Sequence, residues 1–218
     1  MNKERSRLKI SLGLSLAVVV MEIIAAVLSY GNNGSGMFRF YTEDSNIFTF
    51  FACLIYSVCA VRALRGGVIP SWVKTFKYMA VCCLSVTFLV VVCVLSPMYG
   101  ADGYKVMLFY SSMLFHHFLC PLTAAASFLF FEPWPEYTPR KAAVALIPTV
   151  IYAVVTVTLN IAKVMEGPYP FLYVYKQPVY MSVIWVAVII GGAYLVARLL
   201  GYANRRLCPV PAENPKNV

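Results

Sequence analysis

Six blocks of about 20 apolar residues, separated by short clusters of Gly, Pro and charge, constrain this chain more than any other feature. Such a block matches a hydrocarbon core about 30 Å thick, crossed by an α-helix at about 1.5 Å per residue. The blocks cover residues 9–30, 45–64, 76–96, 105–131, 142–163 and 178–201. We therefore expect an all-α polytopic membrane protein with six transmembrane helices. Residues 1–207 form its single domain, and the proline-rich tail, 208–218, is expected to be loosely ordered.

The composition excludes several other classes of protein. The chain is 61% hydrophobic and 12% charged, whereas an average soluble domain is roughly half apolar and about 25% charged. The formal net charge of +9 does not indicate a nucleic-acid-binding protein, because the charges flank apolar segments instead of forming a basic face. No loop is long enough for a soluble domain, so we expect the function to reside within the helical bundle or at its rims.

The distribution of Lys and Arg predicts the orientation in the membrane. With six spans, 14 of the 18 basic residues fall on the side that holds both termini, and the other four are Arg39, Lys105, Lys163 and Lys176. Cytoplasmic loops carry the excess of Lys and Arg in membrane proteins. We therefore expect both termini in the cytoplasm.

Ionisable residues inside the spans are the first candidates for a functional site, because each costs at least about 2.5 kcal/mol at mid-depth in a bilayer. Glu22 lies in the first span, roughly 12 Å below its outer end. It is read either as a site acid or as a protonated carboxyl bonded across helices. The only histidines, His116 and His117, are adjacent and lie near the midplane of the fourth span. They diverge by about 100°, so we expect one to face a site and the other a neighbouring helix.

Pro121 predicts a kink in the fourth helix, because it cannot donate a hydrogen bond to the carbonyl of His117 four residues earlier. Carbonyls freed at membrane depth need water or side chains as partners. A hydrated pocket beside His117 is one reading, and a proline kink used only for packing is the other.

The start of the second span forms another polar cluster. Thr42 precedes two acids, Glu43 and Asp44, which is typical of a helix N-cap with carboxylates in the first turn. Asn46 lies one turn further on the same face as Thr42, in a helix that is otherwise apolar. We expect this face to turn inward. The inward face of the second span, together with Glu22, His117 and Asn160 of the fifth span, predicts a pocket that opens toward the outer leaflet. A belt of aromatic residues is expected beside this pocket, formed by Tyr169, Phe171, Tyr173 and Tyr175.

At these residues the chain resembles a bacterial branch of six-helix membrane proteins related to the animal androgen-induced proteins, which hydrolyse fatty-acid esters of hydroxy fatty acids. The matching stretches are 38–46 (FRFYTEDSN), 117–121 (HFLCP), 130–133 (FFEP) and 167–174 (GPYPFLYV). The resemblance implies Thr42 as nucleophile and a histidine as its base. The spacing to Pro121 in the bacterial branch favours His117, and the animal spacing favours His116.

This chemistry needs further groups around the threonine. A threonine hydroxyl requires a base within hydrogen-bond reach, and a neutral imidazole can serve. Asn46, Asn160 or Arg39 could donate to the oxyanion, and Glu22 could orient the imidazole. The expected substrate is a membrane lipid or fatty-acyl ester, hydrolysed within the bilayer, and the expected location is a bacterial plasma membrane.

Two other classes of function stay open. One is a non-catalytic membrane protein, namely a small transporter, channel or lipid-binding protein with a polar intramembrane pocket in which Glu22 and the histidines are linked to protons. The other is a zinc protein that uses one histidine with Glu22 and Asp44. We expect no cofactor and no metal, because the cysteines lack the spacing of a metal site and the histidines lie on one helix. The sequence does not determine the substrate or the oligomeric state.

Overall fold

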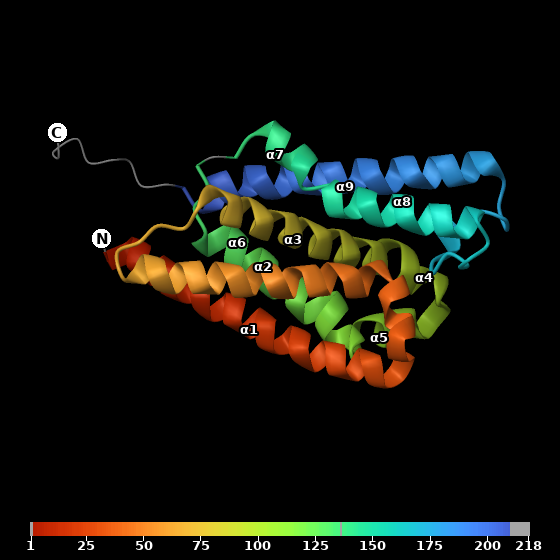
Figure 1. Cartoon of the computed structure of the whole chain (residues 1–218), viewed down its shortest axis with the longest axis horizontal. Coiled ribbons are helices and arrows are strands. Elements are labelled where there is room, and N and C mark those ends of the chain that lie inside the picture. The colour runs from red at the N-terminus through yellow and green to blue at the C-terminus, as the bar shows by residue number, and fades with distance from the viewer. Residues whose placement is uncertain (1, 136, 210–218) are drawn as a thin grey trace.

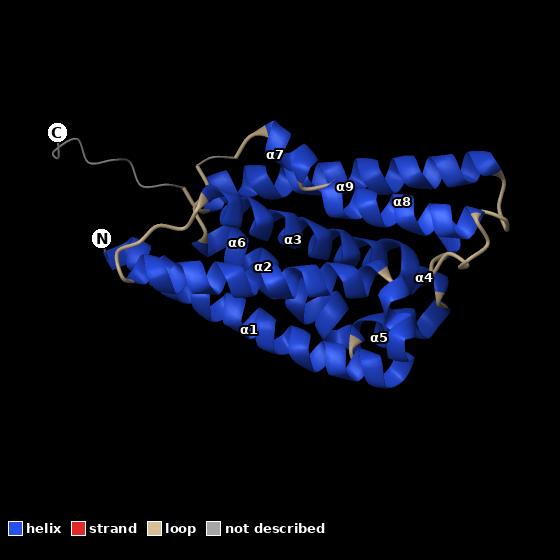
Figure 2. Ribbon diagram, viewed as in Figure 1, coloured by secondary structure: helices blue, strands red, loops and turns tan. Residues whose placement is uncertain are grey.

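The computed structural model describes residues 2–135 and 137–209, and every regular element within these ranges is a helix (Figure 1, Figure 2). Six helices are long and apolar enough to cross a membrane: Lys3–Arg39, Tyr41–Leu64, Ser71–Met98, Leu114–Phe131, Pro139–Ile161 and Val179–Leu207. The prediction of an all-α protein with six transmembrane helices is confirmed. Within the predicted tail, residues 210–218 lie outside the described residues, whereas Cys208 is buried and donates its N–H to the carbonyl of Asn204.

The second and sixth spans are each a single α-helix, and the others combine two or more helical segments. The first two contain α1 (Asn2–Asn33) and α2 (Tyr41–Leu64), joined by the 3-10 turn η1 (Gly34–Arg39). The third contains α3 (Ser71–Val90), the π-helical segment η2 (Val91–Leu95) and α4 (Ser96–Met98), followed by η3 (Gly100–Asp102). The last two contain α7 (Pro139–Val144) with α8 (Ile147–Ile161), and α9 (Val179–Leu207), with η5 (Pro170–Leu172) in the loop between them.

Four helices, α1, α2, α3 and α6 (Cys120–Phe131), form a closed ring in which each packs against the next and α6 returns to α1. Small side chains lie at these contacts, among them the buried Ala25, Ala52, Ala80 and Ala124. In lipid, such residues let helix backbones approach closely enough for van der Waals packing. Helices α8 and α9 lie outside the ring along α3 (Figure 1). Only 11% of the most apolar part of the sixth span is buried, against 56% in the third.

The fourth predicted segment, 105–131, is not one continuous helix. Helix α5 (Gly103–Phe109) ends before a bend in which Ser111 has a φ of 50°, and the chain resumes as the π-helical segment η4 (Leu114–Leu119), which leads into α6. Pro121 accounts for the π-helical turns next to it, because it lacks the N–H that an α-helical ladder needs. The preceding N–H, of Cys120, donates to the carbonyl of Phe115, five residues back.

Both ends of the described chain lie at one end of the bundle, which we call the basic end, where Arg7 Nη1 donates to the carbonyl of Pro209 at 3.2 Å (Figure 1). The charge pattern counts Lys77 among the basic residues of this end, and the structure shows that its side chain lies inside the bundle. Lys77 is buried in α3, with Nζ 2.6 Å from Glu132 Oε1 and 3.7 Å from the centre of the Tyr56 ring. Nζ also donates to Ser15. The ion pair is therefore part of the bundle core.

Removing one partner of the Lys77–Glu132 ion pair should destabilise the protein more than removing both. Lys77→Met leaves a buried carboxylate without its counter-ion, which costs about 3–5 kcal/mol. Lys77→Met combined with Glu132→Gln leaves no buried charge in this cluster and should recover part of that loss. Thermal unfolding in detergent, followed by tryptophan fluorescence, measures both variants. A single variant as stable as the wild type would contradict a structural role for the pair.

Candidate functional site

Thr42 lies in the first turn of α2, at the end of the bundle opposite the basic end. The prediction that it caps the helix is wrong, because Phe40 occupies the N-cap position and no side chain caps the helix there. Glu43 and Asp44 do lie in the first turn, as expected. Thr42 is the second residue of α2, and its side chain is buried, with only 7% exposed.

The hydroxyl of Thr42 contacts His117 of η4. Thr42 Oγ1 lies 3.2 Å from His117 Nε2, and both side chains are buried. The two residues come from the second and fourth spans and are 75 positions apart in the sequence. The structure therefore brings together the threonine and one of the two histidines that the sequence singled out.

The backbone of α5 fixes the proton on the His117 ring. His117 Nδ1 lies 2.6 Å from the carbonyl oxygen of Met107. Since a carbonyl only accepts hydrogen bonds, Nδ1 carries the proton and Nε2 presents its lone pair to Thr42. Met107 lies in the last turn of α5, where carbonyls lack donors within the helix. The bend after α5 thus supplies a partner for the histidine.

The peptide of Thr42 is held by its neighbours on α2. Asn46 Nδ2 donates to the carbonyl of Thr42 at 2.7 Å, and Ser45 Oγ donates to the same oxygen at 3.0 Å. Ser45 also shares a hydrogen bond with Thr87 of α3 at 3.0 Å. Asn46 was predicted to turn inward, and it is buried. Its amide group braces the backbone of Thr42.

Tyr169, in the loop between α8 and α9, reaches the same residue. The N–H of Thr42 donates to the Tyr169 hydroxyl oxygen at 3.4 Å. The Tyr169 ring stacks on Phe171, with ring centres 5.1 Å apart. Burial raises the pKa of Tyr169 to about 12, so its hydroxyl keeps its proton at neutral pH. The sequence placed Tyr169 only in an aromatic belt, although the 167–171 stretch (GPYPF) around it was a usable signal.

The loop that carries Tyr169 is closely folded at Gly167. A Cβ atom at this position would lie 2.5 Å from the carbonyl oxygen of Leu172 and 2.8 Å from its Cβ. Real Cβ atoms do not approach backbone so closely, so only glycine permits this turn. The turn returns the chain over the start of α2 and places Tyr169 against Thr42.

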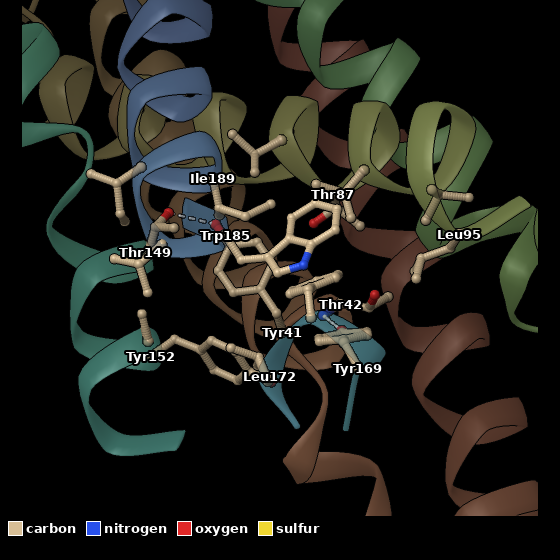
Figure 3. A pocket seen from close by; sticks show the side chains of 17 residues that line it. Tyr41, Thr42, Thr87, Leu95, Thr149, Tyr152, Tyr169, Leu172, Trp185 and Ile189 are labelled. Atoms are coloured by element: carbon tan, nitrogen blue, oxygen red, sulfur yellow. Dashed lines mark hydrogen bonds between the residues drawn. The ribbon is translucent and has the colours of Figure 1, made fainter. Parts of the chain in front are cut away.

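Two cavities meet at Thr42. The first, which we call the apolar cavity, has a volume of about 60 Å³ available to the centre of a water molecule. It lies between α2, α3, α8 and α9 and is lined by aliphatic and aromatic side chains, including Leu95, Tyr152, Leu172, Trp185 and Ile189 (Figure 3). In Figure 3, Thr42 and Tyr169 lie together at one side of this space.

The second cavity, which we call the mouth cavity, measures about 210 Å³ and is also lined by Thr42. His117, Glu43, Asn33 and Tyr99 line it, together with Pro168 and Pro170 of the loop. Thr42, Tyr169 and Leu95 line both cavities. The threonine hydroxyl therefore lies at the junction between an apolar space and a more polar one.

His116 faces a different set of partners. Its Nε2 lies 3.7 Å from Glu22 Oε2 and its Nδ1 lies 3.5 Å from Glu43 Oε1. Glu43 also accepts a hydrogen bond from Ser29 at 2.5 Å. The adjacent histidines thus diverge as the helical geometry predicts. Glu22 was expected to orient the catalytic imidazole, but it lies beside His116. The group that orients His117 is the carbonyl of Met107.

The remaining predicted site residues lie elsewhere. Arg39 is exposed, with its guanidinium 5.9 Å from the centre of the Phe40 ring, and its carbonyl accepts a hydrogen bond from Tyr152 at 2.8 Å. Asn160 is buried and lines a separate surface cavity with Lys163 and Glu166. Neither residue lines a cavity that contains Thr42.

Within residues 2–135 and 137–209, no group of three or more His, Cys, Asp and Glu side chains is arranged to hold a metal ion. The groups that contact Thr42 from other spans and loops are the imidazole of His117 and the phenol of Tyr169. No family model, no curated protein and no solved structure matches the chain.

Proposed function

We propose that the protein hydrolyses fatty-acyl esters within the membrane, with Thr42 as nucleophile and His117 as base. The observation that carries this proposal is the 3.2 Å contact between Thr42 Oγ1 and His117 Nε2, with the imidazole held in the required tautomer by the Met107 carbonyl. Nucleophile, base and orienting group follow the order of a catalytic triad, in which a carbonyl here replaces the usual carboxylate. Membership of the bacterial branch related to the androgen-induced proteins, in a bacterial plasma membrane with cytoplasmic termini, belongs to the same proposal.

The reaction proceeds in two halves. His117 Nε2 takes the proton of the Thr42 hydroxyl as Oγ1 attacks the ester carbonyl carbon, which forms a tetrahedral intermediate. The imidazolium then gives this proton to the departing alcohol oxygen, and the acyl group stays on Thr42. Water, deprotonated by the same nitrogen, releases the fatty acid and restores the threonine.

Tyr169 is the donor best placed for the oxyanion. Its hydroxyl oxygen already accepts the Thr42 N–H, so its own proton is free to point at the carbonyl oxygen of an ester on Thr42. The three donors suggested by the sequence are less suitable. Asn46 is engaged with the Thr42 carbonyl, and Arg39 and Asn160 lie outside both cavities.

The two cavities support a lipid ester as the substrate class. The apolar cavity suits the first part of an acyl chain, because aliphatic and aromatic side chains line it. The mouth cavity suits the alcohol part of the ester, because His117, Asn33 and Glu43 line it. An ester bond between these two parts lies at Thr42, where the hydroxyl and the imidazole meet.

Removing either member of the pair should abolish hydrolysis. We expect Thr42→Ala and His117→Gln each to lower kcat by at least about 10²-fold, because general-base activation of the nucleophile is lost. Thr42→Ser keeps a hydroxyl and should retain measurable activity. The assay is fatty-acid release from long-chain esters by purified protein in detergent.

Two variants serve as matched controls for this prediction. Thr75→Ala removes a hydroxyl that only donates to the Ser71 carbonyl, and His116→Gln removes the histidine that does not contact Thr42. Both should keep most of the activity. Full activity of folded Thr42→Ala, or no activity of the wild type on any lipid ester, would overturn the proposed hydrolase.

Tyr169→Phe tests the oxyanion donor without changing the shape of the cavities. The substitution keeps the ring that stacks on Phe171 and removes only the hydroxyl. Loss of one oxyanion-hole donor lowers kcat by about 10²–10³-fold. We expect that loss in kcat with little change in KM, measured in the same assay. A change in KM alone would assign Tyr169 to substrate binding.

A second candidate function, proton-linked transport, is favoured by the surroundings of His116. Its imidazole lies between the carboxylates of Glu22 and Glu43, and both His116 Nδ1 and Glu22 Oε1 are buried without a hydrogen-bond partner. Ionisable side chains that face one another inside a membrane bundle are typical of proton pathways in transporters.

Proton flux separates the two candidates. In vesicles that contain the purified protein and a pH-sensitive dye, the transporter predicts flux that is lost in Glu22→Gln and kept in Thr42→Ala. The hydrolase predicts no flux in the wild type and ester hydrolysis that depends on Thr42. Proton flux without ester hydrolysis would support the transporter and contradict the hydrolase.

A further inference from the structure

A third cavity lies at the basic end, far from Thr42, and the proposed hydrolysis does not use it. It measures about 360 Å³ and is formed by the start of α1, the end of α2, the start of α3 and the loop after α6. Tyr56, which lines it, lies 14 residues along α2 from Thr42, so the two sites are roughly 21 Å apart along the helix. We call it the basic-end cavity.

The basic-end cavity contains charges of both signs. Arg7 and Lys74 supply two cations, and both side chains are only partly exposed. Glu132 supplies a buried carboxylate, and Glu4 adds an exposed one. Such a lining favours a ligand that carries a negative and a positive group together.

The Glu132 carboxylate has a free side toward a ligand. Its hydrogen bonds from Lys77, Ser11 and Ser127 all end on the same oxygen, Oε1. Within the described residues, no hydrogen bond is formed to Oε2, and this oxygen is not among the fully buried atoms that lack a partner. Oε2 is therefore available to a donor in the cavity that Glu132 lines.

The other walls of the cavity are apolar and continue to the exposed surface of the bundle. Leu8, Ile69 and Phe131 line it, and Val68, between α2 and α3, is 84% exposed. Basic residues beside an apolar rim are typical of the level of the lipid headgroups. A headgroup in the cavity would keep its acyl chains in the bilayer, whereas a soluble ligand would leave the apolar walls without a partner.

We propose that the basic-end cavity binds a phospholipid with a phosphoethanolamine headgroup from the adjacent leaflet. The phosphate lies between Arg7 and Lys74, and the primary ammonium donates to Glu132 Oε2. A choline headgroup cannot donate hydrogen bonds from its quaternary nitrogen, and a glycerol headgroup carries no cation for Glu132. The site therefore selects ethanolamine lipids over choline and glycerol lipids.

Native mass spectrometry of the purified protein tests this site. The protein is mixed with equal amounts of phosphatidylethanolamine, phosphatidylcholine and phosphatidylglycerol of identical acyl chains. We expect the ethanolamine lipid to remain bound preferentially, and the combined variant Arg7→Gln, Lys74→Gln to lose at least about 10-fold in affinity, since one charge-assisted contact contributes about 1.5 kcal/mol or more. The matched control is Lys9→Gln, Arg62→Gln, which neutralises two exposed cations that do not line the cavity.

Several outcomes would overturn the inference. Equal retention of the three lipids, or equal loss in the control variant, would show only general contact with lipid. Displacement of the bound lipid by soluble glycerophosphoethanolamine at similar concentration would assign the site to a free metabolite. Ester hydrolysis is measured in parallel. Because Arg7 and Lys74 lie far from Thr42, we expect the combined variant to keep this activity, so the lipid site and the proposed hydrolase can fail independently.

Discussion

A bilayer offers no water to polar side chains, and this constraint determines which face of each helix turns inward. Helix α1 shows it most clearly, because Ser15, Glu22 and Ser29 recur every seven residues and all three are buried. That spacing keeps them on one face over about 21 Å of the helix, roughly two thirds of the hydrocarbon core. Their partners, Lys77, His116 and Glu43, come from α3, η4 and α2, so the polar face of α1 aligns three other spans.

The same constraint explains why the helix around the histidines departs from regular α-geometry. A break in a membrane helix leaves carbonyl groups without donors, and they must bind side chains. At the end of α5 the carbonyl of Met107 accepts a hydrogen bond from His117, so the end of this helix also orients the imidazole. Pro121 and η4 then set His116 and His117 on different faces, one toward the carboxylates and one toward Thr42.

The sequence predicts features that depend on neighbouring residues, such as the spans, and only part of those that depend on contacts between distant residues. The apolar blocks define the six spans, since length and hydropathy alone set them. Thr42 and His117 stood out because polar groups are costly in lipid. The contact between His117 and the Met107 carbonyl could not be predicted, because every residue has a backbone carbonyl and its position depends on the fold. The ion pair of Lys77 with Glu132 could not be predicted, because the two residues are 55 positions apart and only packing brings them together.

The bundle consists of a packed ring and two outer helices that are mostly exposed, and the proposed site lies between them. Thr42 belongs to α2, a helix of the ring, and His117 belongs to η4, which packs against α1, α2, α3 and α6, so the ring holds both members of the pair in place. The apolar cavity takes one wall from α8 and α9, whose surfaces are mostly exposed to lipid. A cavity of about 60 Å³ holds only the beginning of an acyl chain. For the substrate that we propose, the rest of the acyl chain would pass between α8 and α9, which few packing contacts hold together.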